Sequence, residues 1–124
     1  MTLNASRQQA VYSPALRAGN LLFVSGQVPR NPLDRTLIGS NIVEQAHAVM
    51  RNLSAVLAGE QADLGQLVKV NVYLADIGQI QEFNEVYRSY FSGRLPTRTA
   101  VGAALNGVLV EVDAIAYLQS GSGI

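Results

Sequence analysis

The stretch PTRTAVGAALNGVLVEVDAIAY, residues 96–117, predicts a β-hairpin near the end of the chain. Asn106-Gly107 separates two apolar runs, and this pair is typical of a two-residue type I′ turn, in which both central residues need a positive φ. Pairing Leu105 with Val108 then sets the register of the two strands.

Counting from the Leu105–Val108 pair assigns every hairpin residue to a face, because side chains alternate along a strand. The face expected to enter the core carries Thr99, Val101, Ala103, Leu105, Val108, Val110, Val112, Ala114 and Ala116. The other face carries Arg98, Ala100, Gly102, Ala104, Leu109, Glu111, Asp113, Ile115 and Tyr117. It combines a cation and a carboxylate, expected ~13 Å apart along the sheet, with small residues that leave room for a ligand.

Four further elements are expected upstream. The apolar run at 20–26 predicts a buried strand, and the alternation at 67–74 predicts a second one. Asn41 begins a helix that ends at Gly59, with Glu44 as the second half of a capping box. Asp76 begins another amphipathic helix that ends at Gly93, and residues 29–35 form a loop.

Two amphipathic helices can cover only one face of the expected sheet. The face with Ala100, Ile115 and Tyr117 is too apolar to be left in water and has no third helix. The simplest cover is a second copy of the same chain, so a homo-oligomer is predicted. The alternative is a monomer whose modestly apolar face is solvated.

The composition excludes several classes of function. The chain has 124 residues, which predicts one domain over 1–124 with a disordered tail at 119–124. It has no cysteine, and its nine basic and nine acidic residues give a net charge of zero. Extended binding to nucleic acid or to an anionic membrane is therefore not expected. No secretory signal, membrane span, metal site or dinucleotide site is predicted from the sequence.

Each polar candidate has an ordinary explanation beside a functional one. Arg98 can hold a carboxylate through its planar fork, or it is a surface arginine at a strand start. Glu111 can activate a water, or it is a solvated carboxylate. Tyr12 and Ser25-Gly26 can line a site or serve their loops, and Asn84 lies off the apolar stripe of its helix. The single histidine, His47, is expected to be exposed on its helix, so no catalytic triad is predicted.

The chain resembles the reactive intermediate deaminase family, also known as the Rid, YjgF or endoribonuclease L-PSP family. The resemblance runs in order over roughly residues 10–118. It is carried by the segments YSPA (12–15), AGNLLFVSGQ (18–27), VKVNVYL (68–74), FNEVY (83–87), PTRT (96–99) and VEVDAIA (110–116).

The resemblance implies an α+β, chorismate-mutase-like subunit with two helices on one face of a mixed sheet. It implies a homotrimer whose sheets form a central barrel, with sites in the clefts between subunits. The implied activity is hydrolysis of 2-imino or enamine acids, such as 2-iminopropanoate and 2-iminobutanoate, to 2-oxo acids and ammonia. The implied enzyme is cytoplasmic and uses no cofactor.

By the same resemblance, Arg98 matches the arginine that binds the substrate carboxylate, and Glu111 matches the glutamate that positions water. The remaining cleft positions correspond to Tyr12, Ser25, Gly26, Asn84 and Ala100, the last of which is a cysteine in many members. The hairpin turn is about two residues shorter than is usual, between Arg98 and Glu111.

Two other functions remain open. One is a non-catalytic or regulatory member that binds small carboxylates or a protein partner in the same cleft. The other is an endoribonuclease, which the zero net charge and the absence of a histidine pair disfavour.

Overall fold

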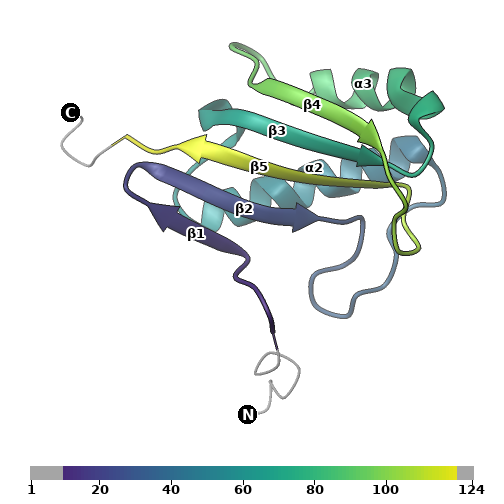
Figure 1. Ribbon diagram of the computed structural model, residues 1–124, viewed down its shortest axis with the longest axis horizontal. Helices are drawn as coiled ribbons and strands as arrows, with labels where there is room; N and C mark the ends of the chain where they lie inside the picture. The colour runs from purple at the N-terminus through teal and green to yellow at the C-terminus, as the bar shows by residue number, and fades with distance from the viewer. Residues whose placement is uncertain (1–9, 120–124) are drawn as a thin grey trace.

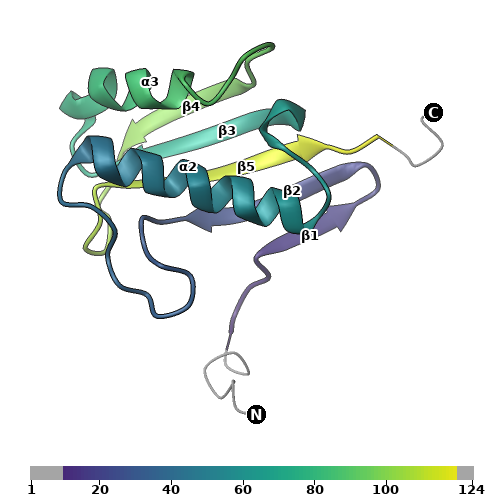
Figure 2. The ribbon, with the colours of Figure 1, turned by 180° about the vertical axis from the view of Figure 1, so that it is seen from behind.

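The computed structural model describes residues 10–119, and it consists of a five-stranded sheet with two helices on one face (Figures 1 and 2). The predicted α+β class is confirmed, as is the expectation that the two helices share a face. The expected tail at 119–124 lies outside the described residues from 120 onward. The elements are β1 (Ala15–Ala18), β2 (Leu21–Gln27), α2 (Ile42–Gly59), η1 (Leu64–Gln66), β3 (Leu67–Leu74), η2 (Ile77–Gln79), α3 (Ile80–Arg88), β4 (Thr97–Gly102) and β5 (Val110–Tyr117).

The predicted hairpin between β4 and β5 is wrong. The strand order is β1-β2-β5-β3-β4, so β3 separates the two strands that the hairpin would have joined. β4 pairs with β3 in parallel, whereas β5 lies in the centre and pairs antiparallel with both β2 and β3. Figure 1 shows the chain crossing the end of β3 on its way from β4 to β5.

β5 takes the central place because of its burial, which outweighs the local turn signal. β5 alternates between fully buried and half-buried residues and gains hydrogen-bonded neighbours on both sides, while β4 is mostly exposed and occupies the edge. Gly107 has a φ of 78°, but Asn106 does not adopt the positive φ that a type I′ turn requires. Instead, the crossing segment is tied to the end of β3, where Ala103 N donates to Leu74 O at 2.9 Å.

This topology changes the faces of β4. Arg98 pairs in register with Val70, and Val70 pairs with the buried Ala114, so Arg98 lies on the helix-covered face. Thr99 and Val101, expected in the core, are exposed on the other face. The assignment of β5 was right, because Val110, Val112, Ala114 and Ala116 are all buried.

The first predicted helix is confirmed as α2. Asn41 Oδ1 accepts a hydrogen bond from Glu44 N at 2.9 Å, and the helix ends at Gly59. The Glu44 side chain bonds Ser40 N at 2.8 Å, one residue before the position that a capping box requires.

The second predicted helix is shorter than expected. Asp76 Oδ1 accepts from Gly78 N at 2.9 Å and begins a 3₁₀ turn, α3 follows, and the helix ends at Arg88 rather than Gly93. β1, which the sequence did not predict, pairs with β2 around a turn in which Gly19 has a φ of 61°. Only glycine adopts that conformation at no steric cost.

The core lies between the helices and the sheet, and it includes the fully buried Leu53 and Phe83. Among residues 10–119, Gln45 is the one buried polar side chain. Its Oε1 accepts from Leu109 N at 2.8 Å, and its Nε2 donates to Gly39 O at 3.1 Å, so α2 holds the segment that crosses to β5. No helix among residues 10–119 is long and apolar enough to cross a membrane.

Candidate functional site

The predicted site residues separate into two cavities. One, named here the arginine pocket, is lined by Asn84, Tyr87, Arg88, Leu95, Pro96 and Arg98 and has a volume of about 210 Å³. The other, named the glutamate pocket, has a volume of about 410 Å³ and includes Tyr12, Ser25, Gly26, Asn52 and Glu111 in its lining.

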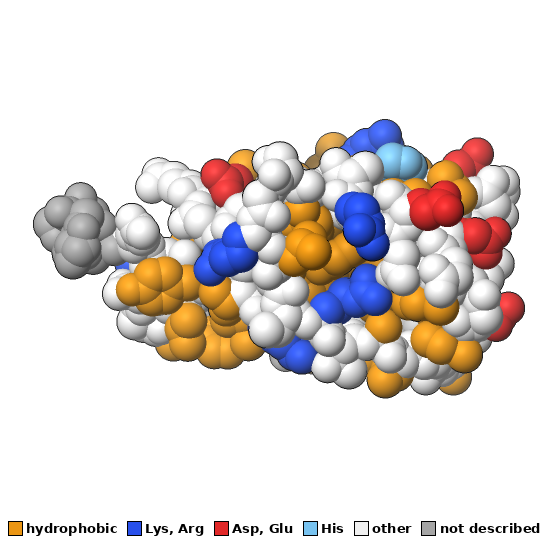
Figure 3. Space-filling view, turned by 90° about the horizontal axis from the view of Figure 1, so that it is seen from above, with side chains coloured by type: hydrophobic (Ala, Val, Ile, Leu, Met, Phe, Trp, Pro, Cys, Tyr) orange, Lys and Arg blue, Asp and Glu red, His pale blue; other side chains and the backbone are white. Residues whose placement is uncertain are grey.

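The arginine pocket lies where the last turns of α3 meet the start of β4. Figure 3, which looks down on this edge of the molecule, shows Lys and Arg side chains gathered around an apolar patch. Asn84, Tyr87 and Arg88 follow an i, i+3, i+4 spacing, so α3 presents all three on one side. Arg98 enters from β4 on the helix-covered face.

Two contacts fix the Arg98 guanidinium. Its Nη1 donates to Asn84 Oδ1 at 2.8 Å, and its Cζ lies 4.9 Å from the centroid of the Tyr87 ring. A cation over an aromatic face is attracted by the ring quadrupole. Because guanidinium carries five N–H donors and Asn84 occupies one of them, Arg98 keeps donors for a carboxylate.

Tyr87 has an unusual hydroxyl. The residue is 6% exposed, and among the described residues its hydroxyl oxygen has no hydrogen-bond partner. Burial raises the pKa of Tyr87, and the nearby Arg98 charge opposes that rise. The phenol is therefore neutral and contributes its ring, rather than an ionised oxygen, to the arginine pocket.

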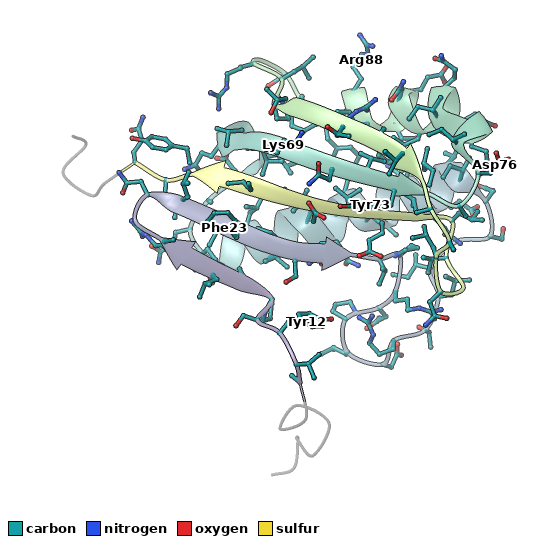
Figure 4. All side chains as sticks on the ribbon, viewed as in Figure 1. Tyr12, Phe23, Lys69, Tyr73, Asp76 and Arg88 are labelled. Atoms are coloured by element: carbon teal, nitrogen blue, oxygen red, sulfur yellow. The ribbon has the colours of Figure 1, made fainter. Side chains whose placement is uncertain are left out.

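The glutamate pocket is built around a β-bulge. Val24 pairs with Ala114 and Gln27 with Val112, so Ser25 and Gly26 together oppose a single residue of β5. Ser25 Oγ donates to Ser13 O at 2.6 Å, and Ser25 N donates to Pro14 O at 3.0 Å. These bonds tie the segment that carries the exposed Tyr12, which Figure 4 labels, to the end of β2.

Gly26 makes room for the Glu111 carboxylate. A Cβ at position 26 would collide with Glu111 Oε2, so a side chain there requires the carboxylate to move. Burial raises the pKa of Glu111, and the negative charge of Asp113 raises it further. A carboxylate whose pKa is raised toward neutrality is a better proton acceptor for water than an ordinary one.

The structure does not bring Arg98 and Glu111 together within one chain. Glu111 pairs with Tyr73 and lies on the open face of the sheet, whereas Arg98 lies on the helix-covered face. The predicted arrangement on one face is therefore wrong, since it followed from the hairpin register. Ala100 shares the Arg98 face and is half-buried, but it does not line the arginine pocket.

The expectation for His47 also needs correction. His47 is half-buried rather than exposed, and its Nδ1 lies 2.7 Å from Tyr90 Oη, which joins α2 to the residues after α3. Asn84, which the resemblance gives as a cleft residue, lines the arginine pocket and accepts the hydrogen bond from Arg98.

Tyr87 and Arg88 were missed as site residues. Their helical spacing from Asn84 is the signal that would have found them. Among residues 10–119, no group of three or more His, Cys, Asp or Glu side chains is arranged to hold a metal ion.

The fold is that of a small α+β protein, and its two cavities are lined by polar and charged side chains. Residues 2–118 match the family model described as endoribonuclease L-PSP, so the chain belongs to that family. A RutC family protein of Pyrococcus horikoshii is 38% identical over 120 residues, which cover 95% of each chain.

Solved structures agree with this assignment. The Rid family protein YyfA from Yersinia pestis superposes with a TM-score of 0.84 at 31% identity, covering 88% of this chain and 89% of its own. E. coli TdcF, solved with bound serine, has a TM-score of 0.80 at 27% identity, covering 87% and 88%.

Proposed function

We propose that this protein hydrolyses reactive 2-imino and enamine acids, such as 2-iminopropanoate and 2-iminobutanoate, to 2-oxo acids and ammonia. The observation that carries the proposal is the state of Arg98, which is fixed by Asn84 and Tyr87 yet keeps free N–H donors in a cavity of small-molecule size. Membership of the endoribonuclease L-PSP family, with its RutC and Rid relatives, supports the same class of site.

The proposed reaction needs two groups from the protein, one to bind the substrate carboxylate and one to accept a proton from water. Arg98 binds the substrate carboxylate by a bidentate, charge-assisted contact and thereby places the adjacent imine carbon. Glu111 accepts a proton from water as the water oxygen bonds to that carbon. Glu111 then returns that proton to the amine nitrogen of the carbinolamine, ammonia leaves, and loss of the hydroxyl proton gives the 2-oxo acid, so water and the protonated imine account for all atoms. An enamine enters the same route after its carbon is protonated to the imine. This reaction requires no cofactor.

The two cavities are proposed to join across an interface between copies of the chain. Within one copy the anchor and the base are on opposite faces, so a complete site needs Arg98 from one copy and Glu111 from another. The open face supports this arrangement, because it exposes the apolar side chains of Phe23 and Tyr117 at 41% and 47%. We propose a cyclic homotrimer, located in the cytoplasm, with three such inter-subunit sites.

A coupled assay tests the activity. A dehydratase generates 2-aminoacrylate, and release of the 2-oxo acid is followed with and without the protein. We expect acceleration by the wild type and its loss in Arg98→Ala. Arg51→Ala is the matched control, because it removes an exposed arginine of α2 that lines neither cavity. Absence of acceleration by the wild type rejects the activity, and full activity of Arg98→Ala rejects the assigned anchor.

The second candidate is a non-catalytic member that binds small carboxylates or amino acids. The relative TdcF, solved with bound serine, favours this function. Calorimetric titration with serine and pyruvate distinguishes the two, because ligand binding that depends on Arg98 without any turnover identifies a binding protein.

A further inference from the structure

Arg88 is a second arginine in the lining of the arginine pocket. It lies in the last turn of α3, one helical turn after Asn84 and next to Tyr87. Figure 4 shows Arg88 projecting from α3 beyond the β4 edge of the sheet, and the side chain is exposed. Arg88 therefore lies toward the solvent side of the pocket, whereas Arg98 is half-buried within it.

The pocket has two positive charges and no carboxylate in its lining. Within residues 10–119, neither guanidinium has a carboxylate oxygen within the 4.0 Å of an ion pair. Arg98 bonds the neutral amide of Asn84, which leaves its charge uncompensated. The end of α3 accounts for a cation at Arg88 through the helix dipole, but it does not account for two unpaired arginines around one cavity.

The volume and lining of the pocket suit a short acid. Its volume of about 210 Å³ is several times the ~30 Å³ that a water molecule occupies in the liquid. The Tyr87 ring, Leu95 and Pro96 give it an apolar wall for a hydrocarbon chain. A ligand with one carboxylate uses only Arg98, while a second carboxylate at the far end compensates Arg88 as well.

We propose that Arg88 is a specificity-determining residue that selects 2-imino acids carrying a second, terminal carboxylate. This inference rests on the proposed function for its substrate class, but the two-cation pocket stands on its own geometry. Arg98 binds the carboxylate beside the imine carbon, and Arg88 binds the terminal one.

The affinity of the protein for two unreactive oxo acids tests the role of Arg88 without an activity assay. 2-Oxoglutarate and 2-oxopentanoate have the same five-carbon chain and differ in the terminal carboxylate, so they isolate its contribution. In calorimetric titrations we expect the wild type to bind 2-oxoglutarate about tenfold more tightly, as one charge-assisted contact provides. Arg88→Gln is expected to remove the preference, and Arg51→Gln, the matched control on α2, is expected to keep it.

The rate of imine hydrolysis provides a second test of the same role. An amino acid oxidase generates the imines of glutamate and norvaline, and the ratio of their kcat/KM values is compared between the wild type and Arg88→Gln. We expect that ratio to fall about tenfold in the variant. Equal binding of both oxo acids by the wild type, or an equal loss of both in Arg88→Gln, overturns the inference. Preferential binding of 2-oxoglutarate with no turnover of either imine supports the assigned role of Arg88 and rejects the deaminase function instead.

Discussion

Arg98 and Glu111 lie on opposite faces of the same sheet. The register runs from Arg98 to Val70 on the helix-covered side, and from Glu111 to Tyr73 on the open side. Side chains on one strand alternate between faces, so no rotamer change brings this cation and this carboxylate to one small substrate. If both take part in one reaction, they come from different copies of the chain.

Mixing two inactive variants tests this directly. Arg98→Ala keeps a complete glutamate pocket, and Glu111→Gln keeps a complete arginine pocket. When the two are co-expressed in equal amounts, about one quarter of the sites in a cyclic assembly combine an intact half from each neighbour. We expect each variant alone to be inactive and the mixture to recover about a quarter of the wild-type kcat. A mixture as inactive as its components contradicts a shared site.

Gly26 gives a second prediction, because its missing Cβ is what leaves space for the Glu111 carboxylate. Gly26→Ala is expected to displace that carboxylate and lower kcat by roughly 100-fold, since a shift of about 1 Å at a catalytic group has that cost. KM is expected to change little, because Arg98 is untouched.

Gly59→Ala is the matched control for that substitution. An added Cβ at position 59 has no heavy atom within 4 Å, and the residue lies at the end of α2. We expect unchanged kinetics and a free energy of unfolding that rises by about 0.5–1 kcal/mol. An equal loss of activity in both variants would show that Gly26 has no special relation to Glu111.

The raised pKa of Glu111 predicts a pH-dependent stability. The folded state binds the carboxyl proton more tightly than the unfolded chain, whose reference pKa is 4.5. The stabilisation is therefore complete below that pKa and is lost as the pH rises through the folded pKa. Glu111→Gln, neutral at every pH, is expected to melt higher than the wild type at pH 7, with the difference shrinking toward pH 4.

Circular dichroism melts across that pH range measure the effect. Glu60→Gln removes the same charge from an exposed position just after α2 and is expected to show no such trend.

Asp113→Asn extends the test to catalysis. Asp113 is the second cause of the raised pKa, so the acidic limb of the kcat profile is expected to move to lower pH. If the acidic limb does not move in Asp113→Asn, Glu111 is not the group that accepts the proton.

Periodicity and capping predicted much of the fold, because those signals are local. α2 begins at Asn41 and ends at Gly59 as expected, and β2, β3 and β5 lie where their apolar runs indicated. The helix that was expected to reach Gly93 ends at Arg88, since the apolar Tyr90 and Phe91 pack on the core without continuing the helix.

The pairing of β4 was beyond local signals. Asn106-Gly107 favours a hairpin, but the central place between β2 and β3 goes to the more apolar β5, and this long-range competition leaves β4 at the edge beside β3. All the proposed site residues except Ala100 line one of the two cavities, but Arg98 and Glu111 line different ones. The wrong neighbour for β4 does not change what Arg98 or Glu111 can do chemically. It does change whether one chain holds both residues in one site.

Tyr87 allows ring and hydroxyl to be separated by two substitutions. Its hydroxyl is buried and has no partner among the described residues, whereas its ring lies under the Arg98 guanidinium. Tyr87→Phe removes the unpaired group and keeps the ring, so the free energy of unfolding is expected to rise by about 1 kcal/mol with KM unchanged. Tyr87→Leu removes the ring and is expected to raise KM several-fold, because Arg98 then keeps only the Asn84 contact. Denaturant unfolding and steady-state kinetics on both variants measure the two effects separately. A KM that rises in Tyr87→Phe as much as in Tyr87→Leu would assign the effect to the hydroxyl and reject the ring as the support for Arg98.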